Sequence, residues 1–162
     1  MDISLCCTLT ASFTNCSITR NQASDLGGAL YANIQTETNF NNCTIVNNSA
    51  ANGGDGFYFN TILNHILNLS NSILWNHTHT IETNDATNTT LNIDHCVIDH
   101  TPVYAGLGNS NMNPLFLNAT NLIGNDGVWR TTDDGLNLTS CSAAIDAGYT
   151  LLSPSEDITG FM

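Results

Sequence analysis

The sequence predicts an all-β fold in which a repeated unit winds into a parallel β-solenoid. Four short segments align without gaps, they recur at a regular interval, and no helical period accompanies them. The segments are NCSITRN (15–21), NCTIVNN (42–48), NSILWNH (71–77) and HCVIDHT (95–101). One unit cannot cover its own apolar face, so we expect successive coils to stack about 4.8 Å apart around a shared interior.

Each segment carries a small residue at its second position. These anchors are Cys16, Cys43, Ser72 and Cys96, which are 27, 29 and 24 residues apart. Large apolar residues stand three positions before them, and aliphatic residues stand two positions after them. The first set is Phe13, Phe40, Leu69 and Ile93, and the second is Ile18, Ile45, Leu74 and Ile98. Two residues that are two apart share a face of a strand, whereas the odd spacing implies a corner, so each set should form an inward column.

A second block repeats in the first two units and supplies another strand. Gly27-Gly28-Ala29-Leu30-Tyr31 aligns with Gly54-Asp55-Gly56-Phe57-Tyr58. The glycines predict a turn and the residues that follow them predict a strand. Leu30 and Phe57 should therefore stack on each other, and so should Tyr31 and Tyr58.

The residue before each anchor should lie at a corner and form a column of amides. This column contains Asn15, Asn42, Asn71 and His95, and a second column would contain Asn21, Asn48 and His77. Stacked amides hydrogen-bond along the axis, so much of the Asn content is structural. The anchor cysteines should be buried thiols that pack as small apolar residues. The alternative is a disulfide that involves Cys6, Cys7 or Cys141.

The regular pattern stops after the fourth segment. We place parallel β-helix coils in residues 1–102, and the last coil with a loop-rich C-terminal cap in residues 103–162 of the same domain. Gly, Asn and Pro interrupt the pattern from 103 onward, and a solenoid needs a cap over its last exposed backbone edge. The expected total is about four to five coils.

Composition excludes several classes of function. The chain has 162 residues, two basic and 14 acidic, for a net charge of -12. Nucleic-acid binding and docking on anionic lipid both rely on Lys and Arg, so we expect neither. No apolar run is long enough to span a membrane, so we expect no membrane insertion. Met1 is not followed by the basic start of a secretory signal, so an export signal would have to lie upstream.

The coils and the tail resemble a known group of proteins. NCTIVNNSA, GGDGFY and NSILWNH are similar to coils of secreted, right-handed parallel β-helix proteins of the pectin-lyase-like superfamily, particularly the surface proteins called choice-of-anchor Q. GGALY is also similar to repeats of polymorphic outer-membrane adhesins. The tail follows the family order with NPLFL (113–117), TDDGL (132–136), AIDAG (144–148) and DITG (157–160). The resemblance implies an extracellular or bacterial cell-surface location within a larger chain.

The same superfamily contains polysaccharide lyases and glycoside hydrolases, so catalysis needs consideration. Paired carboxylates could act as acid and base in hydrolysis, and the candidates are Asp94 and Asp99. A lyase would instead use a basic residue, for which only Arg20 and Arg130 could serve. The family's Gly-His-Gly and Arg-x-Lys motifs are missing, and the two aspartates flank a strand. A partial or degenerate polysaccharide-active enzyme therefore remains the alternative to a non-catalytic module.

Oxygen-rich turns in the tail are candidates for a calcium site. Asn125 and Asp126 precede a glycine, and Asp133 and Asp134 precede another. Calcium takes six to eight oxygen ligands, which such residues supply, although Asp-Gly also simply forms turns. Ca²⁺ is thus a possible cofactor, with a capping role for these loops as the alternative.

We expect an adhesin-like, non-catalytic module that presents Thr, Asn and aromatic side chains to a glycan or polysaccharide. The chain has 24 Asn and 21 Thr residues, so its polar character comes from amides and hydroxyls. An aromatic face with nearby amides suits a sugar ring, and the candidates are Tyr31, Tyr58 and Trp75. These three could instead be packing residues, and a structural spacer that binds nothing is the third hypothesis.

Overall fold

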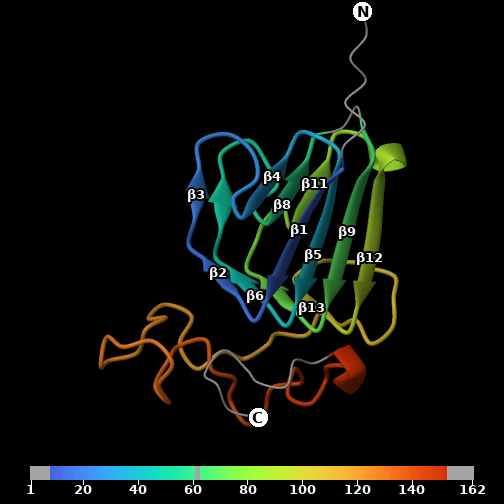
Figure 1. Cartoon of the computed structure of the whole chain (residues 1–162). Coiled ribbons are helices and arrows are strands. Elements are labelled where there is room, and N and C mark those ends of the chain that lie inside the picture. The colour runs from blue at the N-terminus through green and yellow to red at the C-terminus, as the bar shows by residue number, and fades with distance from the viewer. Residues whose placement is uncertain (1–7, 61–62, 153–162) are drawn as a thin grey trace, which may run out of the picture.

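The chain folds as an all-β solenoid of about three turns, with almost no helix. Our computed structural model describes residues 8–60 and 63–152. Two four-stranded parallel sheets, a three-stranded sheet and a two-stranded sheet form its walls (Figure 1). The predicted four to five coils were too many, because no named strand follows residue 98 within the described part of the chain.

Each turn contributes one strand to each main sheet. The first turn contains β1 (Leu9–Thr14), β2 (Ser17–Thr19), β3 (Gln22–Ala23) and β4 (Leu30–Ala32). The second contains β5 (Thr36–Asn41), β6 (Thr44–Val46), β7 (Ser49–Ala50) and β8 (Phe57–Phe59). The third contains β9 (His65–Ser70), β10 (Ile73–Trp75) and β11 (Ile81–Thr83). The 3₁₀ turn η1 (Ala86–Asn88) then leads to β12 (Thr89–Asp94) and β13 (Val97–Ile98).

The strands pair in the register that the repeats predict. In the sheet of β1, β5, β9 and β12, hereafter the long-strand sheet, Phe13 pairs with Phe40, then Leu69, then Ile93. The sheet of β2, β6, β10 and β13 is hereafter the short-strand sheet. Its aliphatic residues are also register partners and form a column. That column is Ile18, Ile45, Leu74 and Ile98.

Aromatic rings and aliphatic side chains fill the interior. Phe40 stacks between Phe13 and Phe57, with ring centroids 4.7 and 4.9 Å apart. Phe57 belongs to the third sheet, which contains β4, β8 and β11, so this stack joins two walls. Side chains alternate between inward and outward along each strand, and β5 and β9 show this as a strict alternation of buried and half-buried residues.

Asparagine occupies the corners because the backbone there is left-handed. Asn15, Asn42, Asn71 and His95 all have φ between 48° and 54°, and Asn and His tolerate this region better than most residues. The Nδ2 of Asn42 donates to the Oδ1 of Asn15 over 2.5 Å, which confirms the start of the predicted ladder. A further amide column on the long-strand sheet links Asn39, Asn68 and Asn92.

The second predicted column is confirmed for its amides and ends in a buried imidazole. The Nδ2 of Asn21 donates to the Oδ1 of Asn48 over 2.9 Å. His77 is 6% exposed, and neither ring nitrogen has a hydrogen-bond partner among the described residues. Burial penalises the cation more than nearby Asp55 favours it, so the pKa of His77 falls to about 4.

The anchor cysteines are thiols. Cys16, Cys43, Cys96 and Cys141 are all free, while Cys6 and Cys7 lie outside the described residues. Cys43 and Cys96 belong to the core, and burial raises the pKa of Cys96 to about 12. These two thiols are therefore packing residues and not nucleophiles.

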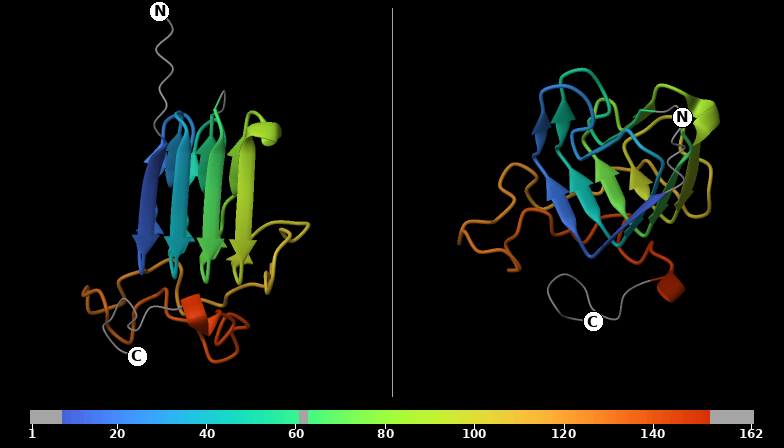
Figure 2. Two further views of the ribbon diagram at one scale, coloured as in Figure 1. Left: turned by 45° about the vertical axis from the view of Figure 1, so that its right-hand side comes forward. Right: turned by 45° about the horizontal axis from the view of Figure 1, so that its top comes forward.

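Residues 103–152, hereafter the strap, form loops and turns after the last coil. Its first part covers the open edge of β13, the last strand of the short-strand sheet. There the Ile98 N–H donates to the Ser110 carbonyl, and the Ser110 N–H donates to the Cys96 carbonyl. The rest of the strap does not stay at that end. It runs back beneath the ends of the long strands to the first coil and then returns to the 3₁₀ turn η2 (Thr150–Leu152), which lies beneath the middle of the long-strand sheet (Figure 2). None of the described helices is long and apolar enough to cross a bilayer.

Candidate functional site

The strap is held against the outer face of the short-strand sheet by polar contacts with the coil corners. At one corner, the Arg20 guanidinium donates to the Thr120 carbonyl over 2.5 Å, and the Asn47 amide donates to the Ala119 carbonyl over 3.2 Å. These contacts join the first two coils to the middle of the strap. Arg20 and Asn47 occupy equivalent positions in successive coils, and both donate to the Ala119 carbonyl.

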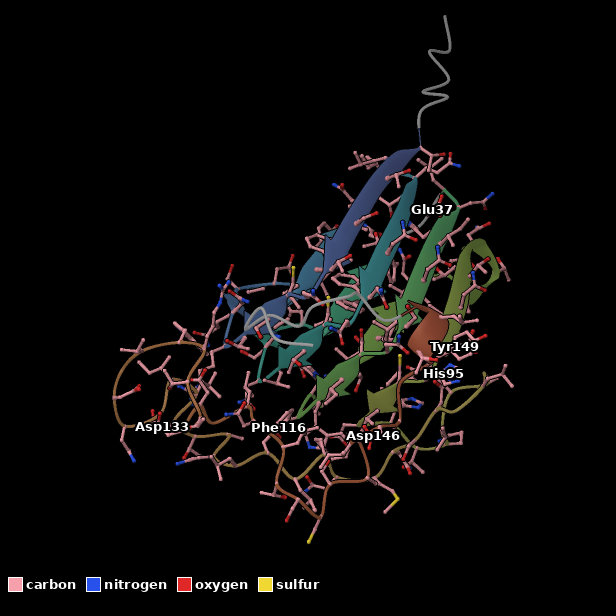
Figure 3. The ribbon with its side chains drawn as sticks, turned by 60° about the horizontal axis from the view of Figure 1, so that its bottom comes forward. Glu37, His95, Phe116, Asp133, Asp146 and Tyr149 are labelled. Carbon is pink, nitrogen blue, oxygen red and sulfur yellow. The ribbon has the colours of Figure 1, made fainter. Side chains whose placement is uncertain are left out.

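The strap's far end is held at the opposite corner by Asn71. Its Oδ1 accepts from the Tyr149 N–H over 2.7 Å, and its Nδ2 donates to the Tyr149 carbonyl over 3.1 Å. The ring of Tyr149 stacks on His95 with centroids 5.2 Å apart. Figure 3 shows His95 and Tyr149 together beneath the strand ends, with Asp133 at the far side of the strap. The side-chain amide of Asn71, which belongs to the predicted corner column, is thus hydrogen-bonded to the strap's backbone.

A pocket of about 420 Å³ lies between the outer faces of β2 and β6 and the 128–137 part of the strap. We call it the Trp129 pocket. Its floor carries hydroxyls from the two strands, and its other side carries an indole, a guanidinium and a carboxylate. The floor is made by Ser17, Thr19 and Thr44, and the strap contributes Trp129, Arg130, Asp134, Leu136 and Asn137.

The lining of this pocket combines an aromatic surface with hydrogen-bond donors and acceptors. Trp129 is half exposed, and its indole ring offers an apolar aromatic surface. Arg130 supplies donors, the hydroxyls supply both donors and acceptors, and Asp134 supplies an acceptor. A sugar ring has an apolar face for the indole and hydroxyls for the other groups.

Asp134 is the most informative residue of the pocket. It is 8% exposed, and its Oδ2 accepts from the Arg130 N–H over 2.6 Å and from the Thr131 N–H. Its Oδ1 is buried without a hydrogen-bond partner among the described residues. A buried carboxylate oxygen without a donor is costly, and Asp134 lines the Trp129 pocket.

The other predicted calcium ligands are occupied by the backbone of their own loop. The Oδ2 of Asp133 accepts from the Asn125 N–H over 2.6 Å, and the Oδ1 of Asp126 accepts from the Val128 N–H. The Thr131 hydroxyl and the Asn125 N–H hold the pKa of Asp133 below its ordinary value. Among the described residues, no three His, Cys, Asp or Glu side chains form a metal-binding group. This geometry favours turn capping, and calcium stays a prediction.

The structure divides the predicted aromatic residues between two faces. Tyr31 and Tyr58 stack on the β4–β8–β11 sheet with centroids 6.0 Å apart, and Tyr31 is 43% exposed. The Asn60 amide donates to the Tyr31 hydroxyl over 2.9 Å. Trp75 lies instead on the short-strand sheet, where it lines a pocket of about 320 Å³ with Phe116 of the strap. Tyr31, Tyr58 and Trp75 therefore do not form one site.

The candidate catalytic residues also lie apart from one another. Asp94 ends β12 and its Oδ1 accepts from the Leu107 N–H over 2.7 Å. Asp99 follows β13, and its carbonyl accepts from the Thr80 hydroxyl over 2.8 Å. Arg130 lies in the strap, where it lines the Trp129 pocket. Asp94 is thus used to hold the strap's first turn, and the catalytic hypothesis stays untested.

Trp129 is the residue that sequence reasoning missed. No repeat contains it, so it had no column to mark it, and its neighbours Asp133 and Asp134 suggested calcium instead. The available signal was a tryptophan in a Gly- and Asp-rich loop, where an apolar ring is not needed for packing.

No protein-family model, curated protein or solved structure in our comparisons matches this chain. The fold is consequently established by the structure alone, and the site is interpreted from its own geometry.

Proposed function

We propose that this chain is a non-catalytic carbohydrate-binding module built on a β-solenoid, with its sugar site in the Trp129 pocket. The observation that carries the proposal is that the half-exposed Trp129 lines the same pocket as Asp134, whose buried Oδ1 has no hydrogen-bond partner among the described residues. The hydroxyl floor from β2 and β6 completes a lining that matches the two faces of a sugar ring.

The wider setting of the proposal is display outside the cell as part of a larger, adhesin-like protein. The resemblance to choice-of-anchor Q and other pectin-lyase-like surface proteins supports this setting. The abundance of neutral amides and hydroxyls on the coils also suits contact with glycans, since such groups bind sugar hydroxyls without net charge.

Glycan-array screening followed by calorimetry tests the proposal. We expect a neutral glycan to bind, and Trp129→Ala to weaken that binding at least tenfold because it removes the aromatic surface. Trp129→Phe should restore part of the affinity. Val128→Ala is the matched control, because Val128 is exposed, adjacent in sequence and outside the pocket lining.

Two results would contradict the proposal. One is the absence of any bound glycan on the array, and the other is binding that Trp129→Ala leaves unchanged. If Tyr31→Ala abolishes binding while Trp129→Ala does not, the sugar site lies on the β4–β8–β11 sheet instead. Release of new reducing ends from a bound polysaccharide would favour the enzyme alternative.

A further inference from the structure

The Trp129 pocket continues beneath the strap into a second pocket. This neighbour encloses about 320 Å³, and we call it the Asn71 pocket. Thr44, Leu136 and Asn137 line both cavities, so the two meet at these residues. The two adjoining pockets lie between the strap and the short-strand sheet, and together they are hereafter called the strap groove.

The strap groove crosses the strands instead of following them. Its floor begins at Ser17 on β2, passes Thr44 on β6 and Ile73 on β10, and reaches Val97 on β13. Neighbouring strands lie about 4.8 Å apart, so four strands span about 14 Å along the solenoid axis. A single sugar ring cannot fill a groove of that length, whereas a short linear chain can.

No described Asp, Glu, Lys or Arg side chain lines the Asn71 pocket. Its polar lining includes the side chains of Thr44 and Asn137, while the Asn71 amide and the Ser72 hydroxyl are hydrogen-bonded within the protein. Among the described residues, the strap groove has two charged groups, Arg130 and Asp134, which have opposite signs and lie at its other end. Since the protein carries a net charge of -12, a polyanionic chain would be repelled and an uncharged one would not.

We propose that the strap groove binds an uncharged linear oligosaccharide that lies parallel to the solenoid axis. One sugar contacts Trp129 and Asp134, and the following sugars extend across β6 and β10 into the Asn71 pocket. This inference rests on the proposed function, because it extends the same sugar site. It adds the class of ligand, its minimum length and its direction across the coils.

Gly148 offers a way to close the far end without disturbing the Trp129 pocket. It lines the Asn71 pocket, and a Cβ placed on it would approach no atom closer than 3.4 Å, at the Asn71 Oδ1. Its φ lies outside the left-handed region, so a larger residue imposes no backbone strain there. Gly148→Val should thus fill the groove while leaving the fold intact, which a thermal melt checks.

The experiment is calorimetry with matched series of cello- and manno-oligosaccharides of two and four sugars, and with oligogalacturonate as the charged comparison. We expect the tetrasaccharide of the neutral series that binds to be at least tenfold tighter than its disaccharide. Gly148→Val should reduce tetrasaccharide affinity to the disaccharide level, Trp129→Ala should abolish both, and oligogalacturonate should not bind.

The outcomes separate this inference from the proposed function. Equal affinity for both lengths, or a tetrasaccharide affinity that Gly148→Val leaves unchanged, overturns the strap groove while the sugar site at Trp129 stands. Preference for oligogalacturonate overturns the uncharged ligand class. If neither neutral series binds, the inference fails, and the glycan array then decides the proposed function independently.

Discussion

The coils and the strap are stabilised in different ways. In the coils, equivalent side chains from successive turns stack in columns, and Phe57, Leu67 and Leu74 are fully buried. In the strap, backbone turns are held by carboxylates and amides such as Asp133, Asp134 and Asn118. Ten of the fifteen exposed large hydrophobic side chains in the described residues belong to the strap. The coils therefore supply the buried apolar core, and the strap leaves more of its apolar side chains exposed.

The largest expected effect is the removal of a ring from the coil interior. Phe57→Ala should lower the free energy of unfolding by about 3–5 kcal/mol, because it leaves a cavity against Phe40. Leu117→Ala in the strap should change it by less than about 0.5 kcal/mol, since Leu117 is half exposed. Chemical denaturation measures both. Similar losses for the two variants would contradict the division between coils and strap.

The second effect is acid destabilisation of the coils through His77. Its folded pKa is about 4 against about 6.5 when unfolded, so between these values the unfolded chain binds a proton that the folded chain does not. The contribution of neutral His77 to the free energy of unfolding is complete above about pH 6.5. It falls by about 3 kcal/mol as the pH drops to about 4.

Denaturation at several pH values checks this sign and size. His77→Asn should flatten the slope, because Asn cannot be protonated and can join the Asn21–Asn48 column. A residual slope is expected from His65, whose pKa burial also lowers. A slope that His77→Asn leaves unaltered would assign the acid sensitivity to other groups.

Substitutions of one coil glycine and one strap glycine should also differ in their effect on stability, by a smaller amount. A Cβ on Gly28 would lie 2.3 Å from the Asp55 carbonyl oxygen, which belongs to the next coil. Gly28→Ala should therefore cost about 1–3 kcal/mol through overpacking. Gly127 in the strap has φ +69° and no atom within 4 Å of such a Cβ. Gly127→Asn should be tolerated within about 0.5 kcal/mol, since Asn accepts this backbone region. Thermal melts compare the two.

The smallest effect on stability should come from removing the ring stack between Tyr149 of the strap and His95. Tyr149→Ala removes the stack on His95, worth about 0.5–1.5 kcal/mol, but keeps the backbone bonds to Asn71. We expect faster amide exchange in the strap near residue 149 with unchanged exchange in β5 and β9. Hydrogen-exchange mass spectrometry reads both regions, and equal acceleration throughout would show that the strap and the coils unfold as one unit.

The columns could be predicted from the sequence because each one repeats the same residue class at the same position. Phe13, Phe40, Leu69 and Ile93 were placed together by spacing alone, and their pairing confirms it. The number of coils could not be predicted as well, because nothing repetitive marks where the winding stops. We placed a last coil within residues 103–162, whereas the described part of this segment forms loops and turns that run back along the coils.

The candidate site was predicted only in parts. Asp134 and Arg130 were selected for calcium and for catalysis, and the structure places both beside Trp129. Ser17 and Thr44 gave no signal, because outward hydroxyls occur throughout this sequence. Their contribution depends on which face of the solenoid the strap covers.

The sequence by itself determined the winding, the register and the corners of this protein. A repeated apolar position can be buried only if the turns stack in line, and a left-handed corner favours Asn, so local pattern and global fold agree. Only the tertiary structure decided where the strap lies and which residues face each other across it. Those contacts join a coil residue such as Asn71 to a strap residue such as Tyr149, which belongs to no repeat, so no periodicity encodes them.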